Sequence, residues 1–415
     1  MKSSLLKRRE SIFGQGSPLF YSDPLHIVRG KGVTLYDAKG KQYIDMYNNV
    51  PCVGHCHPSV VEAIQSQVAN LNVHNRYLHS SILEYGERLI DKHSANFDCV
   101  VFGCTGTEAN EVALQMARHA TQGKGFICTD AGYHGNSSEV RRLSRPSIED
   151  KIYRSIPFPE LYRNSEGDPL AYYLNLLAEV IRSFQEDEIP LAGMLVCPIC
   201  ANEGLPNIPN GFMSRATQMI REAGGLVIAD EVQSGLCRTG MWWGYEKEGF
   251  LPDIVTMGKP LGAGVPLSAV VSSRPIVELF REKTRYFNTF ASSPLQAAAG
   301  NSVLNILEDE DLGNRSRSVG EWLLRRLSES QNNHPNVGDV RGKGLFIAIE
   351  WVKDRESKEP DRNGALQVVE TLKEEGYLIG AAGKYGNVLK LRPPLVFNEE
   401  NASGFLATME RILHN

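Results

Sequence analysis

Residues 224–235 read GGLVIADEVQSG, a short apolar run that ends at the carboxylate of Asp230. Similar apolar runs lie along the middle of the chain, at residues 125–128, 194–197 and 254–257. Each of these runs lies near a helical pattern, such as residues 211–222. Short buried strands that alternate with helices predict an α/β fold, with a mostly parallel sheet and helices on both of its faces.

The segments on either side of this central region predict two smaller units. Near the start, strand-like runs at 33–37 and 42–46 flank a turn, which indicates a hairpin. After Pro294, two helical patterns, the strand-like run 345–351 and two more helical patterns indicate a small α+β domain. We therefore expect three parts: an N-terminal arm and small sheet (1–57), a large α/β domain (58–300) and a small α+β domain (301–415).

The composition excludes several classes of protein. The 415 residues are 42% hydrophobic and 22% charged, which is ordinary for a globular protein and argues against global disorder. The net charge of −5, without a basic stripe, argues against a nucleic-acid partner. No apolar run approaches the roughly 18 residues of a membrane span, and the first residues lack the apolar core of a signal peptide. We expect a cytoplasmic protein that binds neither nucleic acid nor membrane.

Two cysteine patterns raise the question of a metal site. Cys52-Val-Gly-His-Cys-His57 mixes the two ligand types, and Cys197-Pro-Ile-Cys200 has the spacing of half a zinc site. A structural zinc site needs a second ligand pair at a matching spacing, and the sequence offers none. We expect no metal, and we expect Cys197 and Cys200 to act as small apolar residues at the end of a strand.

The stretch Gly103-Cys-Thr-Gly-Thr-Glu-Ala-Asn110 is the sharpest local feature. A strand is predicted to end at Phe102, and a helix to begin near Thr107. The free N–H groups and dipole of such a helix terminus attract an anion, and Thr107 can add a hydroxyl donor. A plain helix cap gives the same pattern, so this stretch alone leaves both interpretations open.

A carboxylate and a lysine follow two of the predicted strands. Asp230 lies at the carboxyl end of its strand, where open α/β sheets place ligand-binding groups, although a helix N-cap is an alternative. Lys259 lies in the glycine-rich turn 258–264, where lost hydration lowers the pKa of an amine toward values that allow attack on carbonyls. An ordinary exposed loop lysine is the alternative for Lys259.

Together, the three features match the needs of pyridoxal 5'-phosphate. The helix terminus binds the phosphate, Asp230 keeps the pyridine nitrogen protonated, and Lys259 holds the aldehyde and later moves a proton. Tyr133, in Ala131-Gly-Tyr-His-Gly135, supplies an aromatic ring to cover the cofactor ring.

Over nearly its whole length the chain resembles the class III aminotransferases, which are fold-type I pyridoxal-phosphate enzymes. The resemblance implies a sheet of the seven-stranded type and a homodimer with shared active sites. It also implies that Val53-Gly-His-Cys-His-Pro58 holds no metal. The cofactor-binding positions that it implies are Gly106 and Thr107 (phosphate), Tyr133 (ring stacking), His134 beside it, Asp230 (ring nitrogen), Gln233 (ring hydroxyl), Lys259 (aldehyde) and, from the neighbouring subunit, Thr289 (phosphate).

Within that family, the ethanolamine-phosphate phospho-lyases are the most similar group, in the segments 53–58, 75–79, 253–260 and 387–394. In transaminases that use glutamate or 4-aminobutyrate, a glutamate and an arginine form a switch that admits either a carboxylate or an uncharged side chain of the substrate. Here Asn202 and Lys390 stand at these two positions. A shift of one residue would put Glu203 in the glutamate's place. Lysine cannot reproduce the fork of arginine on a carboxylate, but it is a good point charge for phosphate. Arg76 is expected to add a second charge.

The sequence thus predicts an enzyme that eliminates phosphate and ammonia from a small phosphorylated primary amine. The alternative is an ω-amine or amino-acid transaminase with a 2-oxo acid acceptor, which would use the same cofactor ligands. Only Asn202 and Lys390 discriminate between the two. A regulatory protein on this fold would be expected to lose Lys259 or Asp230, and both are present.

Overall fold

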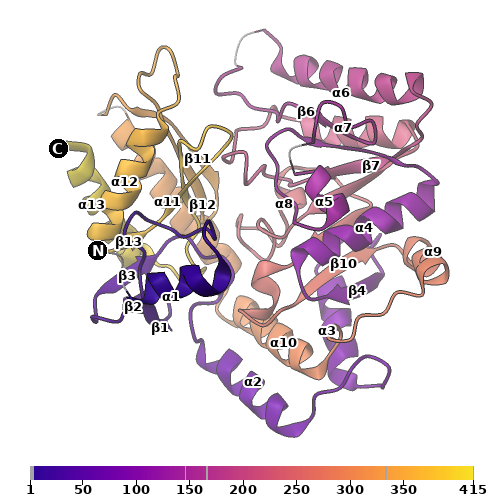
Figure 1. The fold of residues 1–415 in the computed structure, drawn as a ribbon, viewed down its shortest axis with the longest axis horizontal. Helices are drawn as coiled ribbons and strands as arrows, with labels where there is room; N and C mark the ends of the chain where they lie inside the picture. Colours follow the sequence, from indigo (N-terminus) through magenta and orange to yellow (C-terminus); the bar gives the residue numbers. More distant parts are fainter. Residues whose placement is uncertain (1–3, 145, 165–166, 332–333, 415) are drawn as a thin grey trace.

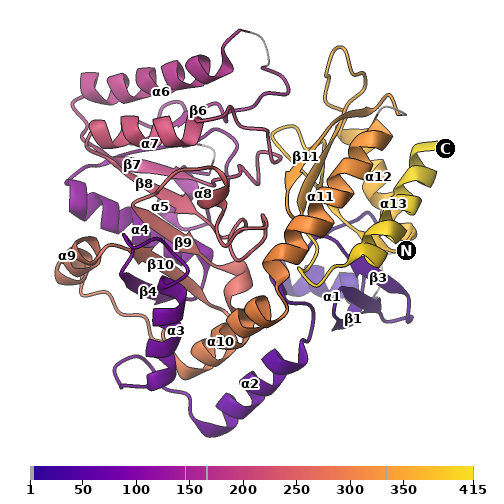
Figure 2. The ribbon, with the colours of Figure 1, turned by 180° about the vertical axis from the view of Figure 1, so that it is seen from behind.

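The computed structural model describes residues 4–144, 146–164, 167–331 and 334–414. Figures 1 and 2 show a large body built around one long sheet, beside a smaller body that contains both ends of the chain.

The large body contains a seven-stranded sheet in the order β4-β10-β9-β8-β7-β5-β6. Neighbours pair in parallel except at β10, which runs antiparallel to both β4 and β9. The predicted mostly parallel sheet is confirmed; the reversed strand was not predicted. The strands are β4 (Cys99–Gly103), β5 (Gly125–Thr129), β6 (Tyr153–Ile156), β7 (Leu191–Val196), β8 (Leu226–Asp230), β9 (Ile254–Met257) and β10 (Ser268–Ser272).

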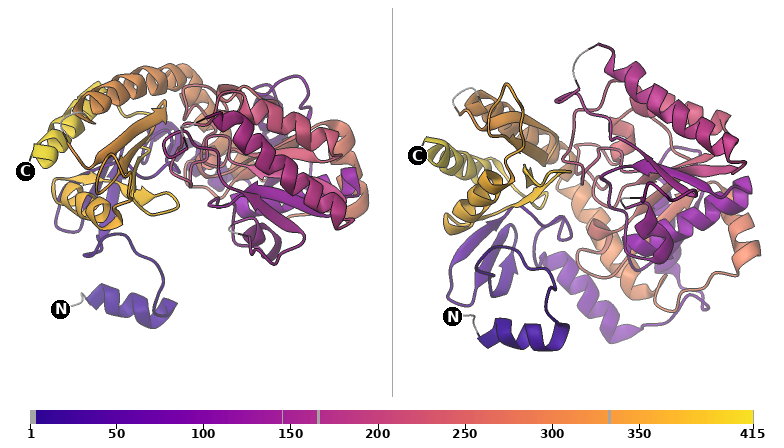
Figure 3. Two further views of the ribbon diagram at one scale, coloured as in Figure 1. Left: turned by 90° about the horizontal axis from the view of Figure 1, so that it is seen from above. Right: turned by 45° about the horizontal axis from the view of Figure 1, so that its top comes forward.

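Helices cover both faces of this sheet (Figure 3). Alternate residues of a strand point to opposite faces. In β8, Ile228 therefore joins the core cluster under α4, while Val227 and Ala229 join the cluster under α6 and α7. The helices of the large body are α2 (Pro58–Asn70), α3 (Ser80–Ile90), α4 (Gly106–Thr121), α5 (Ser138–Arg142), α6 (Pro169–Glu186), α7 (Phe212–Glu222), α8 (Gly244–Lys247), the 3-10 turn η1 (Lys259–Gly262), α9 (Arg274–Thr284) and α10 (Pro294–Asp309).

The smaller body contains two four-stranded sheets, ordered β1-β2-β3-β13 and β11-β12-β15-β14. Its strands are β1 (Ile27–Lys31), β2 (Thr34–Asp37), β3 (Gln42–Asp45), β11 (Val337–Lys343), β12 (Phe346–Trp351), β13 (Tyr377–Leu378), β14 (Gly380–Ala382) and β15 (Val388–Leu391). Its helices are α11 (Leu312–Gln331), α12 (Arg362–Glu374) and α13 (Glu399–His414), and α1 (Ser4–Phe13) lies on the arm that precedes β1.

The first of these sheets combines strands from the N-terminal and C-terminal parts of the chain, because β13 pairs in parallel with β3. The expected domain limits after residues 57 and 300 remain predictions. Helix α10 runs continuously through position 300.

Two properties concern the described residues as a whole. No helix among them is long and apolar enough to cross a membrane. No group of three or more His, Cys, Asp and Glu side chains in the same ranges could hold a metal ion.

The sheet brings distant parts of the chain to one edge. The carboxyl ends of β4, β5, β7, β8 and β9 meet there, since these strands run in the same direction. The connections that leave these ends carry most of the polar residues singled out in the sequence, as expected at the ligand-binding edge of an open α/β sheet.

Candidate active site

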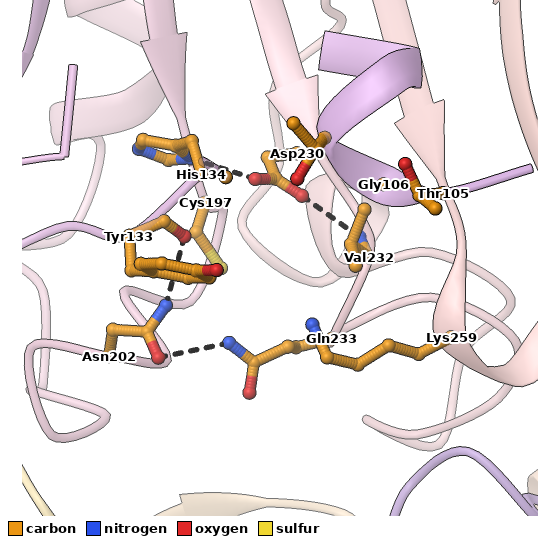
Figure 4. A pocket seen from close by; sticks show the side chains of 12 residues that line it. Thr105, Gly106, Tyr133, His134, Cys197, Asn202, Asp230, Val232, Gln233 and Lys259 are labelled. Atoms are coloured by element: carbon orange, nitrogen blue, oxygen red, sulfur yellow. Dashed lines mark hydrogen bonds and ion pairs between the residues drawn. The ribbon is translucent and has the colours of Figure 1, made fainter. Parts of the chain in front are cut away.

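One pocket at this edge gathers seven of the residues predicted to bind the cofactor (Figure 4). These seven residues come from the connections after four strands, β4, β5, β8 and β9. The lining residues are Thr105, Gly106, Thr107, Tyr133, His134, Gly135, Cys197, Asn202, Asp230, Val232, Gln233 and Lys259.

The amino terminus of α4 forms one wall of the pocket. The side chain of Thr105 caps the helix by accepting from the Glu108 N–H at 3.1 Å, so capping and the free N–H groups of the first turn coexist. A side chain at Gly106 would lie 2.9 Å from a methyl of Val232, so the backbone is closely covered there. The Thr107 hydroxyl accepts from the Asn136 N–H at 3.3 Å, which leaves its own proton free to donate. This wall can bind an anion.

Asp230 is buried at the end of β8 and is held on both carboxylate oxygens. Its Oδ1 accepts from the Val232 N–H at 3.1 Å. Its Oδ2 lies 2.7 Å from His134 Nδ1 and accepts from Asn110 Nδ2 at 3.1 Å. These contacts place His134 behind the carboxylate, next to Asp230 (Figure 4). Asn110 was not predicted as a site residue, although it closes the motif 103–110.

Lys259 opens η1 directly after β9, and its side chain extends into the pocket toward Gln233 (Figure 4). Among the described residues, its amine has no hydrogen-bond or ion-pair partner. Burial lowers the pKa of Lys259, and the nearby Asp230 carboxylate opposes that shift. A partly desolvated, unpaired amine of this kind is able to attack a carbonyl group.

A chain of hydrogen bonds crosses the open side of the pocket. Asn202 donates to the Tyr133 carbonyl at 3.2 Å and accepts from Gln233 Nε2 at 3.1 Å. Glu203 lies elsewhere, buried with its Oε1 2.5 Å from the Thr129 hydroxyl. Asn202, not Glu203, therefore faces the site, so the one-residue shift does not bring a carboxylate into it.

A second cavity of about 640 Å³ adjoins the first and shares Tyr133, Asn202, Gln233 and Lys259 with it. Lys390 and Arg392 line this cavity from the end of β15, with exposed fractions of 4% and 7%. Lys390 Nζ donates to the Ala201 carbonyl at 2.9 Å, and burial, reinforced by Arg392, holds the pKa of Lys390 well below its usual range.

Arg392 was missed in the sequence, although it lies in the quoted segment 387–394. Its Nε donates to the Tyr47 carbonyl at 2.5 Å, and its Nη1 donates to Gln233 Oε1. The signal that could have found it is the period of two in a strand, which puts residues 390 and 392 on the same face.

Two predicted residues are not among those lining either cavity. Thr289 lines a separate pocket with Tyr77 and Phe290. The Arg76 guanidinium lies 4.0 Å from the centre of the Phe287 ring.

The match to known proteins agrees with this geometry. The family described as aminotransferase class-III matches residues 20–413. The chain belongs to the class III aminotransferase family. As a member of this family, it is a pyridoxal-phosphate-dependent enzyme, either a lyase or a transaminase.

Two relatives and one solved structure are similar to this class III aminotransferase over nearly its whole length. It is 36% identical to an alanine–glyoxylate aminotransferase 2-like protein of Drosophila melanogaster, over 98% of this chain and 86% of that protein. It is 33% identical to ethanolamine-phosphate phospho-lyase homolog 1 of Caenorhabditis elegans, over 99% of this chain and 93% of that protein. An Arthrobacter phospholyase, solved in complex with phosphoethanolamine, is 39% identical with a TM-score of 0.96, over 99% of both chains.

Proposed function

We propose that this class III aminotransferase is a phospho-lyase, which eliminates phosphate and ammonia from a small phosphorylated primary amine of the ethanolamine-phosphate kind. The observation that carries this proposal is the pair of buried cations Lys390 and Arg392. Both line the cavity next to Lys259, and neither has a carboxylate within ion-pair distance among the described residues.

Two buried basic groups side by side are costly to keep charged in the absence of a counter-charge. Removing an ion from water costs several kcal/mol unless it is paired and hydrogen-bonded (about 3–5 kcal/mol when a partner is lost). Among the described residues, the hydrogen bonds of Lys390 and Arg392 go to carbonyl and amide oxygens, and their other contacts include the rings of Phe346 and Tyr47. A doubly charged phosphate ester would supply the missing negative charge. This supports a phosphorylated substrate.

The cofactor that we propose is pyridoxal 5'-phosphate, because the first pocket fits each part of it. The helix terminus at Gly106 and Thr107 offers donors to the phosphate, and Tyr133 offers a ring face. Asp230 offers a carboxylate to the ring nitrogen, and Lys259 offers a free amine to the aldehyde. Gln233, with His134 behind Asp230, completes the set. When bound, this cofactor supplies a ring that withdraws electrons from the substrate.

Different residues of the chain then act on different parts of the substrate and the cofactor. Lys259 takes the proton from the substrate carbon that bears nitrogen. Asp230, oriented by His134 and Asn110, holds a proton at the ring nitrogen. Lys390 and Arg392 hold the phosphate group at the far end of the substrate. Once phosphate has left, water hydrolyses the remaining enamine, so that the products are phosphate, ammonia and a carbonyl compound.

Transamination is the alternative, since aminotransferases are also among the relatives. A transaminase of the glutamate-dependent kind would need the glutamate–arginine switch, and Asn202 and Lys390 occupy those positions. The deciding experiment incubates the enzyme with ethanolamine phosphate, without any 2-oxo acid, and assays inorganic phosphate. Amine transfer to pyruvate without phosphate release would contradict the phospho-lyase proposal.

We also propose a homodimer in which Thr289 reaches the phosphate of the neighbouring cofactor, with Arg76 near the neighbouring substrate. Large apolar side chains around both residues support this proposal, since Tyr77, Leu78 and Phe290 are 64%, 96% and 76% exposed in the single chain. Clustered exposed apolar groups are typical of an interface. The cytoplasmic location expected from the composition stays a prediction.

A further inference from the structure

The two buried cations differ in how they can act on a phosphate group. Arg392 is tied down, because its Nε and Nη1 donate to Tyr47 and Gln233, and a guanidinium does not release a proton in proteins. Among the described residues, Lys390 makes one hydrogen bond, to the Ala201 carbonyl, which leaves two N–H groups of its ammonium for a ligand.

Elimination of a phosphate monoester makes a demand that binding alone does not meet. When the C–O bond of a dianionic ester breaks, its electron pair goes to the phosphate oxygen. Without a proton, the leaving group would be the strongly basic phosphate trianion. A proton donor at this oxygen therefore lowers the barrier to C–O cleavage.

The surroundings of Lys390 suit it to that task. Burial disfavours its charged form, and two cations face it, Arg392 just after strand β15 and Lys259 after β9. Cys197 and Glu203, from the loop after β7, act in the opposite direction. The net effect is an amine that carries a proton when a phosphate dianion lies beside it, and that releases the proton easily.

We propose that Lys390 protonates the oxygen of the departing phosphate, an inference that rests on the proposed phospho-lyase function. Lys259 takes the proton from the carbon that bears nitrogen, and the electrons of that C–H bond form the new C=C bond. The C–O bond breaks, its electron pair stays on oxygen, and that oxygen takes a proton from the Lys390 ammonium. Hydrogen phosphate leaves, Lys390 is left as a neutral amine, and water returns its proton.

A pair of substrates with different leaving groups tests this role. Sulfate is a weak base and leaves without a proton, whereas phosphate does not. In Lys390→Arg, which keeps a cation but removes the proton donor, we expect kcat for ethanolamine phosphate to fall about a hundredfold or more. We expect kcat for ethanolamine sulfate to change far less. Lys390→Met should show the same selective loss, which covers the case that the larger arginine does not fit.

Lys384→Arg is the matched control. Lys384 lies on the loop between β14 and β15, where its amine pairs with Asp130 at 2.6 Å, and an arginine there keeps that pair. Both kcat values should stay at the wild-type level. Equal losses with both esters in the Lys390 variants would overturn the inference and leave Lys390 as a binding charge. A wild-type enzyme that releases no phosphate would instead overturn the proposed function.

A second measurement does not depend on turnover. Inorganic phosphate is titrated into the holoenzyme by calorimetry, in two buffers of different ionisation enthalpy, at a mildly alkaline pH. Because a phosphate dianion raises the pKa of a neighbouring lysine, the wild type should take up more protons on binding phosphate than Lys390→Arg, whose guanidinium stays charged. Equal proton uptake in the two proteins would contradict the proposed role.

Discussion

His134 Nδ1 lies 2.7 Å from Asp230 Oδ2, and both side chains are buried at the base of the pocket that contains Lys259. The imidazole approaches the carboxylate from behind, while Val232 and Asn110 hold its two oxygens. The carboxylate is therefore fixed in one orientation before any ligand is bound.

Asp230→Asn should fold but lose most of its activity. In this variant, an amide NH2 group replaces one carboxylate oxygen and faces a donor that now binds that oxygen. The lost hydrogen bond costs about 1–3 kcal/mol of the free energy of unfolding. The larger effect is chemical, because a neutral amide does not keep the ring nitrogen of the cofactor protonated. Steady-state kinetics and thermal unfolding check both effects. A near-wild-type rate would show that Asp230 does not have this role.

Borohydride should fix the cofactor to Lys259. Because burial lowers the pKa of Lys259, its trapping by added pyridoxal phosphate in the apoenzyme should have a pH midpoint below that of surface lysines. Lys259→Ala should abolish turnover yet still bind the cofactor through Gly106 and Thr107. Mass spectrometry locates the adduct, and an adduct on another lysine would show that the assignment is wrong.

Lys390→Ala should raise KM for the phosphorylated amine, in addition to the loss of kcat expected when the proton donor is removed. The lost charge-assisted contact alone costs about 1.5–3 kcal/mol, roughly a tenfold to hundredfold loss in kcat/KM. Lys384→Ala, which removes a lysine outside both cavities, should leave KM unchanged. Amine transfer to pyruvate that Lys390→Ala does not affect would favour the transaminase alternative.

Glu231 should make the protein less stable as the pH rises. Its side chain is 1% exposed, and burial raises the pKa of Glu231 from 4.5 to about 7. A raised folded-state pKa means that stability is fully present below the unfolded value and is lost as the pH rises through about 7. The shift corresponds to about 3 kcal/mol of the free energy of unfolding.

Glu231→Gln removes this titration while keeping an acceptor for the Tyr245 N–H, now 2.8 Å away. Denaturant unfolding at pH values on either side of the transition should show a flatter profile for this variant. The exposed carboxylate of Glu282 provides the control, since Glu282→Gln should leave the wild-type profile intact. Parallel profiles for Glu231→Gln and wild type would contradict the assignment.

Thr289→Ala should weaken retention of the cofactor, because the proposal gives this hydroxyl to the phosphate of the neighbouring subunit. Dialysis against cofactor-free buffer, followed by the visible absorption spectrum, measures the loss. Analytical ultracentrifugation tests the arrangement itself, and a fully active monomer would contradict it.

The sequence by itself determined several buried strands and the polar residues that follow their carboxyl ends. The run 224–230 is apolar up to Asp230, and such a segment forms a buried strand whatever lies around it. The strand at Ile254–Met257 and the helix that begins by Thr107 follow from equally local signals. The antiparallel direction of β10 was not predicted, because the direction of a strand within a sheet depends on the connections and not on the residues of the strand itself.

Only the tertiary structure decided which residues share a cavity. Asn202 and Glu203 are adjacent in sequence, yet one faces the pocket and the other packs on Thr129, since the turn between β7 and α7 sets their directions. Arg392 approaches Gln233 from 159 positions away. No local pattern reports such a contact, because it exists only once the two bodies have packed together.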